Sequence, residues 1–377
     1  MTIFRFICIL CMAIFGAAVA PHAVAFAKAA PVTEKILFIP HDGRPISSKQ
    51  TADVVKKLGY DVVMPPEELL GSREDWGHPD ELWSWAEENA AQPGVKAAVI
   101  SSDAMIYGSL VGSRKHSLTK EEVLARAARF DALQRAFPKV PLYVFGSIMR
   151  TPRSGEASGH EEPEYYRRYG ADIFRYTVLR DKGEVEGLTR RERKEYAFLE
   201  RLIPQEALAD WMGRRDKNYA VNAYMIDLLR KRGTFRYLAL GRDDNAPFSQ
   251  THLESRHLTV AGRDLGKTRF QTMAGIDEIA MLMLTRAVNE LRHEVPFVYS
   301  HYNWGRGSNT VPAYSDEKIG ISIGDAVVAA GGLSISSPEK ADVVLTVNTN
   351  PDGRTYEAND HMNDGTAREG TAYFADM

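Results

Sequence analysis

The stretch that decides the fold is ILFIPHDGRP, residues 36–45, because it joins a continuous apolar run to polar and turn-forming residues. Four consecutive apolar residues, Ile36 to Ile39, are typical of a strand that is buried on both faces of a sheet. A helix-like segment at 47–58 and a second apolar run at 61–64 follow. This alternation predicts strand, helix and strand, which is the repeating unit of a parallel sheet.

The same alternation continues along the chain. Further short apolar runs stand at 97–100, 142–145, 237–240, 269–272, 297–299 and 342–347. Together they predict an α/β protein with a mostly parallel sheet that is (β/α)8-barrel-like. Two doubly wound, Rossmann-like domains with a boundary near Gly275 are the alternative. The highly charged segment at about 154–232 has apolar residues at helical spacing, which predicts a helical insertion after the fourth strand.

Residues 1–27 have the three parts of a secretory signal peptide. Arg5 provides the positive charge, residues 6–20 are apolar, and alternating small residues at 23–27 offer cleavage sites. The apolar run is shorter than the roughly 20 residues that a membrane-spanning helix needs. We therefore predict cleavage, export to the periplasm, cell envelope or exterior, and no stable membrane span afterwards. Residues 28–377 are predicted to form a single α/β domain.

The cysteine content and the net charge exclude several kinds of site and partner. Cys8 and Cys11 both lie in the predicted signal peptide, so the mature chain should contain no disulfide, thiolate metal site or cysteine nucleophile. The formal net charge of -3 provides no basic field for nucleic acid, and none is predicted as a partner. Neither GxxxxGK[ST] nor GxGxxG occurs, and we predict no cofactor. The site must work with carboxylates, arginine, histidine and tyrosine.

Polar residues follow most of the predicted strands, at the end where α/β proteins bind ligands. Asp42 and Arg44 follow the first strand, Asp103 the third and Arg150 the fourth. A guanidinium in such a position can clamp a carboxylate, a phosphate or sugar hydroxyls. We predict that both aspartates are catalytic and that both arginines bind substrate. Helix capping and local ion pairing are the structural alternatives for the aspartates.

The run Asp243-Asp244-Asn245 after the fifth strand is the strongest catalytic candidate. Adjacent carboxylates repel each other, which tends to raise one pKa and leave the other group ionised. One group can then donate a proton while the other orients or stabilises. We predict that either aspartate is the acid/base group and that Asn245 binds substrate. A turn before the loop at Pro247 is the alternative.

Other polar residues complete the set of candidates. Glu162, Tyr165 and Tyr166 begin the predicted insertion, where paired tyrosines can stack on a sugar or simply pack in the core. His301 follows the seventh predicted strand and is a further substrate-binding candidate. His41 and His301 could join carboxylates in a metal site, but no compact spacing such as HExxH occurs, and we assign no metal ligand.

Short motifs occur in a fixed order along the chain. They are PxDxRP at 40–45, SDAMIYG at 102–108 with SR at 113–114, MR at 149–150, EEPxYY at 161–166, DDNAP at 243–247 and GIDE at 275–278. As an ordered set they resemble a bacterial family, domain-of-unknown-function family 4127. The resemblance covers most of the mature chain and implies no established activity or catalytic residue. Members are usually longer, so the resemblance also implies a chain truncated at its C-terminus.

The residues taken together predict an exported hydrolase. It would act on a carbohydrate-like or cell-envelope substrate, a small molecule or a glycan, by carboxylate acid/base chemistry. A metal-dependent hydrolase is one alternative and would need His41 or His301 to converge with carboxylates. A non-catalytic exported small-molecule binding protein is the other, and it would hold its ligand without a carboxylate pair close enough to share a proton.

Overall fold

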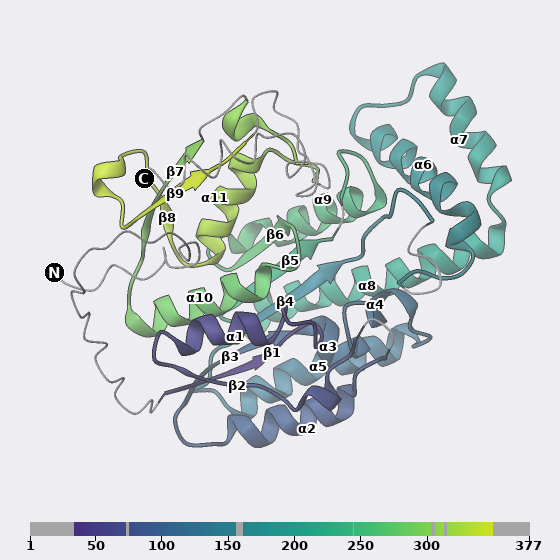
Figure 1. Cartoon of the computed structure of the whole chain (residues 1–377). Helices are drawn as coiled ribbons and strands as arrows, with labels where there is room; N and C mark the ends of the chain where they lie inside the picture. Colours follow the sequence, from purple (N-terminus) through teal and green to yellow (C-terminus); the bar gives the residue numbers. More distant parts are fainter. Residues whose placement is uncertain are drawn as a thin grey trace, which may run out of the picture.

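The computed structural model describes residues 34–72, 75–155, 161–243, 245–302, 306–312 and 315–349 (Figure 1). The predicted signal peptide, Asp244 and residues 350–377 lie outside these described residues. The main sheet consists of six parallel strands in the order β2-β1-β3-β4-β5-β6. They are β1 (Lys35–Ile39), β2 (Asp61–Val63), β3 (Val95–Ser101), β4 (Leu142–Ile148), β5 (Tyr237–Arg242) and β6 (Phe270–Ala274).

The chain reverses its direction of winding once in this sheet. It steps from β1 to β2 on one side, then passes to β3 on the other side and continues to β6. In doubly wound sheets, ligands bind outside the carboxyl ends of the two strands that flank such a reversal. Those strands are β1 and β3 here, so the strand order itself marks where a site is expected.

Helices cover both faces of the main sheet. One face carries α1 (Lys49–Lys56) and α10 (Ile279–Arg292), and the other carries α2 (Pro79–Ala90), α3 (Ser102–Tyr107), α5 (Lys120–Ala136), α8 (Gln205–Arg232) and α9 (Gln250–Gly262). Alternate residues of β1 enter the two cores: Ile36 and Phe38 pack with α1 and α10, and Leu37 and Ile39 with the opposite layer. Burial on both sides explains why these strands are continuously apolar.

The segment between β4 and β5 is helical, as the spacing of its apolar residues predicts. It contains α6 (Tyr166–Val185), α7 (Arg190–Leu202) and α8, and Figure 1 shows α6 and α7 projecting from the body of the molecule. The insertion has a small core of its own, in which Tyr166, Ile173 and Trp211 are buried. The second half of α8 packs on the main core through Val221 and Met225.

A second sheet follows α10. It contains β7 (Phe297–Tyr302), β8 (Leu333–Ser334) and β9 (Val343–Val347), all parallel, in the order β8-β7-β9. The helix α11 (Ile319–Ala329) packs against β6 and α10. The predicted α/β class with a mostly parallel sheet is confirmed. A (β/α)8 barrel is not confirmed, because the described strands divide into one sheet of six and one of three.

No helix within the described ranges is both long enough and apolar enough to cross a lipid bilayer.

A buried histidine behind α3 makes stability depend on pH. His116 is 1% exposed, stacks on Tyr107 at 4.8 Å between ring centroids, and has no hydrogen-bond partner for either ring nitrogen among the described residues. Burial, followed by the positive charges of Lys217, Arg214 and Arg126, lowers the pKa of His116 to about 4. The unfolded chain should protonate it near pH 6.5.

Between about pH 6.5 and 4 the unfolded chain therefore binds a proton that the folded chain does not, and folding loses stability as the pH falls. The two pKa values differ enough to cost about 3 kcal/mol once the pH is below both. His116→Phe keeps the stacking on Tyr107 and should remove about 2 to 3 kcal/mol of this loss between about pH 7 and pH 4.5. Urea unfolding of both proteins at each pH measures it, and an identical pH dependence would contradict the prediction.

Candidate functional site

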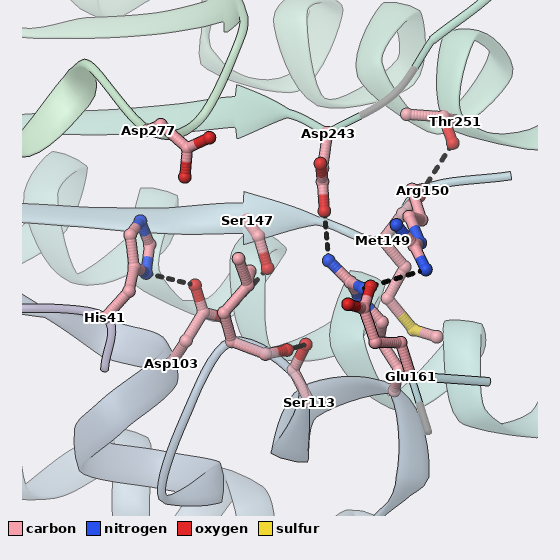
Figure 2. A network of polar contacts seen from close by, with 12 residues as sticks. His41, Asp103, Ser113, Ser147, Met149, Arg150, Glu161, Asp243, Thr251 and Asp277 are labelled. Carbon is pink, nitrogen blue, oxygen red and sulfur yellow. Dashed lines mark hydrogen bonds and ion pairs between the residues drawn. The ribbon is translucent and has the colours of Figure 1, made fainter. Parts of the chain in front are cut away.

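The segments that follow β1, β3, β4, β5 and β6 bring polar side chains to the carboxyl end of the main sheet (Figure 2). We call them the carboxyl-end site. Its members are His41, Asp42, Arg44, Asp103, Arg114, Ser147, Arg150, Glu161, Glu162, Asp243, Asp277 and Glu278. Parallel strands end at a common edge, so residues that are distant in sequence meet there.

The first part of the site spans the reversal between β1 and β3. His41 Nδ1 lies 3.1 Å from Asp103 Oδ2, and Figure 2 shows the two side chains pointing toward each other. Ser147 Oγ donates a hydrogen bond to Asp103 Oδ1 at 2.9 Å, and Ser101 Oγ lies 2.9 Å from His41 Nδ1. All four residues are buried. The carboxylate is thus fixed by a serine on one side and fixes an imidazole on the other.

This contact orients the histidine ring. The Ser101 hydroxyl is the hydrogen-bond partner of Nδ1, and which of the two donates depends on the ring tautomer. The Asp103 carboxylate at ion-pair distance favours the tautomer with its proton on Nδ1, which leaves the lone pair on Nε2. The edge-to-face contact with Phe145, at 4.7 Å between centroids, restrains the ring further. His41 Nε2 is buried and has no hydrogen-bond partner among the described residues. A histidine that has a carboxylate beside Nδ1 and no hydrogen-bond partner at Nε2 has the arrangement of a general base.

The second part of the site reaches solvent. Arg44 Nε lies 3.0 Å from each oxygen of Asp42, and the Arg44 backbone N–H donates to Asp42 Oδ1 at 3.1 Å. The same guanidinium contacts Asp277 Oδ1 at 3.2 Å. The side chains of Arg44 and Asp277 are 42% and 48% exposed, whereas that of Asp42 is 3% exposed. A ligand arriving from solvent would therefore meet Arg44 and Asp277 first.

Glu278 lies beside Asp277 at the start of α10 and is exposed. Gly275, at φ +89°, leaves free the space that the Glu278 carboxyl occupies, because any Cβ there would collide with it. Partial loss of hydration, followed by the negative charges of Asp277 and Asp243, raises the pKa of Glu278. A carboxyl group with a raised pKa is suited to donate a proton near neutral pH.

The third part of the site is a buried network of opposite charges. Arg114, from α4 (Gly112–Lys115), contacts Asp243 and, at 3.2 Å, Glu161. Arg150 contacts Glu161 and Glu162, each at 2.8 Å. Burial raises the pKa of Glu162, although the positive charges of Arg114 and Arg150 oppose that change. Two guanidiniums thus contact three carboxylates, whose charge they offset only in part, in a place that is largely closed to water.

The two predicted tyrosines lie in the helical insertion. Tyr166 is buried, stacks near Trp211 and donates a hydrogen bond to the Pro152 carbonyl at 2.8 Å. Tyr165 donates to Asp210 Oδ2 at 2.7 Å. Burial, above all, raises the pKa of both hydroxyl groups. These contacts pack and brace the insertion, and substrate stacking on either ring stays a prediction.

The remaining candidates are placed as follows. Asn245 is buried, its Oδ1 accepts a hydrogen bond from Ser249 Oγ at 2.9 Å, and its backbone carbonyl accepts one from Arg153 at 3.2 Å. It therefore ties the loop after β5 to the start of α9. His301 is exposed on β7 of the second sheet. Asp244 lies outside the described residues, so its predicted role is untested.

Several members of the site escape prediction from sequence as functional residues. From the sequence, His41 is considered only as a possible metal ligand, and Arg114 and Glu161 appear only within the ordered motifs. Their presence in those motifs is the one sequence signal that could have identified them. Within the described ranges, no group of three or more His, Cys, Asp or Glu residues has a geometry that could hold a metal ion.

Comparison with known proteins identifies the family. A family model described as "Protein of unknown function (DUF4127)" matches residues 36–376. The search of curated proteins finds no match. Among solved structures, the chain has 10% identity and a TM-score of 0.18 to "Crystal structure of a ketoreductase domain from the bacillaene assembly line", over 76% of this chain and 85% of that one, which is too low to carry an argument. Because the family match spans nearly the whole chain and confirms the resemblance of its motifs, the protein belongs to the DUF4127 family.

Proposed function

We propose that the protein is an exported hydrolase that acts on a carbohydrate-like or cell-envelope substrate by acid/base chemistry at the carboxyl-end site. One observation supports this most: His41 Nδ1 lies beside the Asp103 carboxylate, and its buried Nε2 has no hydrogen-bond partner among the described residues, at the same sheet edge as the solvent-exposed contact between Arg44 and Asp277. A proton acceptor and accessible polar groups therefore belong to one edge of one sheet.

Each group has a role in this proposal. His41 takes a proton from water or from a substrate hydroxyl, while Asp103 stabilises the imidazolium that forms. Glu278, the carboxyl with a raised pKa that solvent reaches, donates a proton to the leaving group. Asp243, which contacts Arg114 directly, places a carboxylate at the same site, where it can stabilise positive charge that develops in the transition state.

The substrate class follows from the mixture of donors and acceptors. Arg44 provides only donors, and Asp277 and Glu278 provide acceptors when they are ionised. A sugar hydroxyl both donates and accepts, so a polyol can bind all three side chains at once. The surplus of carboxylates at the exposed edge favours neutral or positively charged substrates over anions.

A panel of glycosides and cell-envelope fragments tests the function. Glu278→Gln should lower kcat on any substrate by at least about 100-fold and change KM little, because it removes the proton donor. Glu88→Gln, on the exposed face of α2, is the matched control and should keep full activity. Ligand-induced thermal stabilisation without turnover would identify a binding protein instead. Unchanged turnover by Glu278→Gln would remove Glu278 from the mechanism.

Export is part of the same proposal and rests on the signal-peptide pattern of residues 1–27. Intact-mass measurement of protein recovered from the periplasm or medium should give a chain that begins after Ala25 or Ala27. A chain that keeps residues 1–27 and stays in the cytoplasm would contradict export.

The finer architecture that we propose is doubly wound rather than a barrel. The strand order 2-1-3-4-5-6, with helices on both faces, supports it for the main sheet.

A further inference from the structure

A pocket of about 870 Å³ lies at the edge of the main sheet opposite the carboxyl-end site. It is formed by the segments that precede β4, β5 and β6, together with the end of α5 and the side of α10. We call it the amino-end pocket. The lining residues used below are Arg135, Pro141, Phe235, Arg236, Arg269 and Arg286. The volume is that of a site for a small organic ligand rather than for a lone ion.

The described residues that line this pocket include four arginines and no acidic side chain. Neighbouring carboxylates offset their charge only in part. Glu290 is shared between Arg236 at 2.5 Å and Arg286 at 2.9 Å. Arg269 donates its hydrogen bond to a neutral acceptor, the Leu229 carbonyl, at 3.2 Å.

The positive charge of Arg135, the fourth lining arginine, is likewise offset only in part. Asp131 contacts Arg135 at 3.1 Å but also contacts Arg232 at 2.9 Å. Among the described residues, the four lining arginines and Arg232, which lies outside the lining, therefore have two carboxylates, Asp131 and Glu290, as ion-pair partners. This excess of positive charge favours a ligand with more than one negative charge.

The deepest arginine is fixed before any ligand arrives. The Arg286 side chain is 9% exposed and donates hydrogen bonds to the carbonyls of Val328 and Thr268, each at 2.9 Å. Its guanidinium also stacks over the Tyr237 ring at 4.0 Å. A donor that is already immobilised loses little conformational entropy on binding, which favours affinity.

The pocket also has an apolar wall. Phe235, which is 2% exposed, and Pro141 both belong to the lining. We propose that the amino-end pocket binds a small phosphate monoester, with the phosphate among the arginines and an apolar body against Phe235 and Pro141. Guanidiniums match the geometry of phosphate oxygens, and a phosphate monoester supplies the two negative charges that the excess calls for.

Calorimetric titration with phenyl phosphate at low ionic strength tests this proposal on the full mature chain. Saturable binding at one site is expected, weaker binding of inorganic phosphate, and none of benzyl alcohol, which lacks the charge. Arg269→Gln should weaken the affinity for phenyl phosphate by roughly tenfold or more, as expected for one charge-assisted hydrogen bond. Arg263→Gln is the matched control, because Arg263 is exposed on η2 (Arg263–Leu265) and outside the lining.

Arg135→Gln provides a second test, since its side chain is 68% exposed and its removal should not disturb folding. It should also weaken binding severalfold. The proposal is overturned if phenyl phosphate shows no saturable binding at millimolar concentration. It is equally overturned if Arg263→Gln weakens binding as much as Arg269→Gln does, because the attraction would then be diffuse surface charge.

Discussion

Arg114→Met is expected to lower the free energy of unfolding by about 3 to 5 kcal/mol, which is the usual effect of removing one partner from a buried ion pair. The Arg114 side chain is 3% exposed and contacts Asp243 and Glu161. Glu161 keeps its contact with Arg150, but Asp243 loses the guanidinium beside it. A nearly buried carboxylate then loses its contacting cation and keeps only the more distant charges of Arg150 and Arg44, so the folded state bears more of its desolvation.

Urea denaturation with an unchanged m-value measures this loss. Arg201→Met is the matched control, because Arg201 is exposed on α7 and, within the described part of the chain, donates to the Ala197 carbonyl alone; we expect a change within about 0.5 kcal/mol. Adding Asp243→Asn to Arg114→Met should recover part of the stability, since it removes the orphaned charge. If Arg114→Met were no more harmful than Arg201→Met, the network would not be a stabilising feature of the fold.

The second large effect concerns catalysis. Asp103→Asn is expected to lower kcat by about 100- to 10,000-fold on any substrate that the wild-type protein hydrolyses, because the amide cannot stabilise an imidazolium or fix the same tautomer. His41→Gln should have an effect of similar size. The folded structure should survive both changes in near-ultraviolet circular dichroism, since each substitution preserves the size of the side chain.

The double variant separates a catalytic pair from two independent structural residues. Residues that act as a unit are non-additive, so His41→Gln with Asp103→Asn should be about as slow as either single variant. His78→Gln, an exposed histidine in the loop before α2, is the control and should leave kcat unchanged. Losses that multiply in the double variant, or variants that retain activity, would exclude the pair as the general base.

The strands of the main sheet could be predicted because burial on both faces leaves a simple pattern. The apolar run at 36–39 falls within β1, and the run at 142–145 falls within β4. The two-residue strand β8 is too short to produce such a pattern. The choice between one barrel and two sheets stays open from sequence alone, although the alternative boundary near Gly275 does fall between β6 and β7, because strand pairing is decided by long-range contacts.

The site could be predicted only in part, for a related reason. Asp42, Asp103 and Arg150 lie at the carboxyl end because every parallel strand delivers its next residues there. Their partners come from elsewhere: Arg114 stands on a short helix, 129 residues from Asp243. The helix dipole accounts for Asp277 from sequence alone, yet in the folded chain that carboxylate also contacts Arg44.

The network around Arg114 has a consequence for the order of folding. Its members are separated by 47 residues (Arg114 to Glu161) and by 129 residues (Arg114 to Asp243) along the chain. Closing such long loops is entropically costly, so contacts of this kind form after the local helices and the first strand pairs. The charged groups of this network can lose their hydration only once β5 has docked beside β4. Substitution of Arg114 should therefore leave the folding rate almost unchanged and mainly raise the unfolding rate, because its contacts form after the transition state of folding.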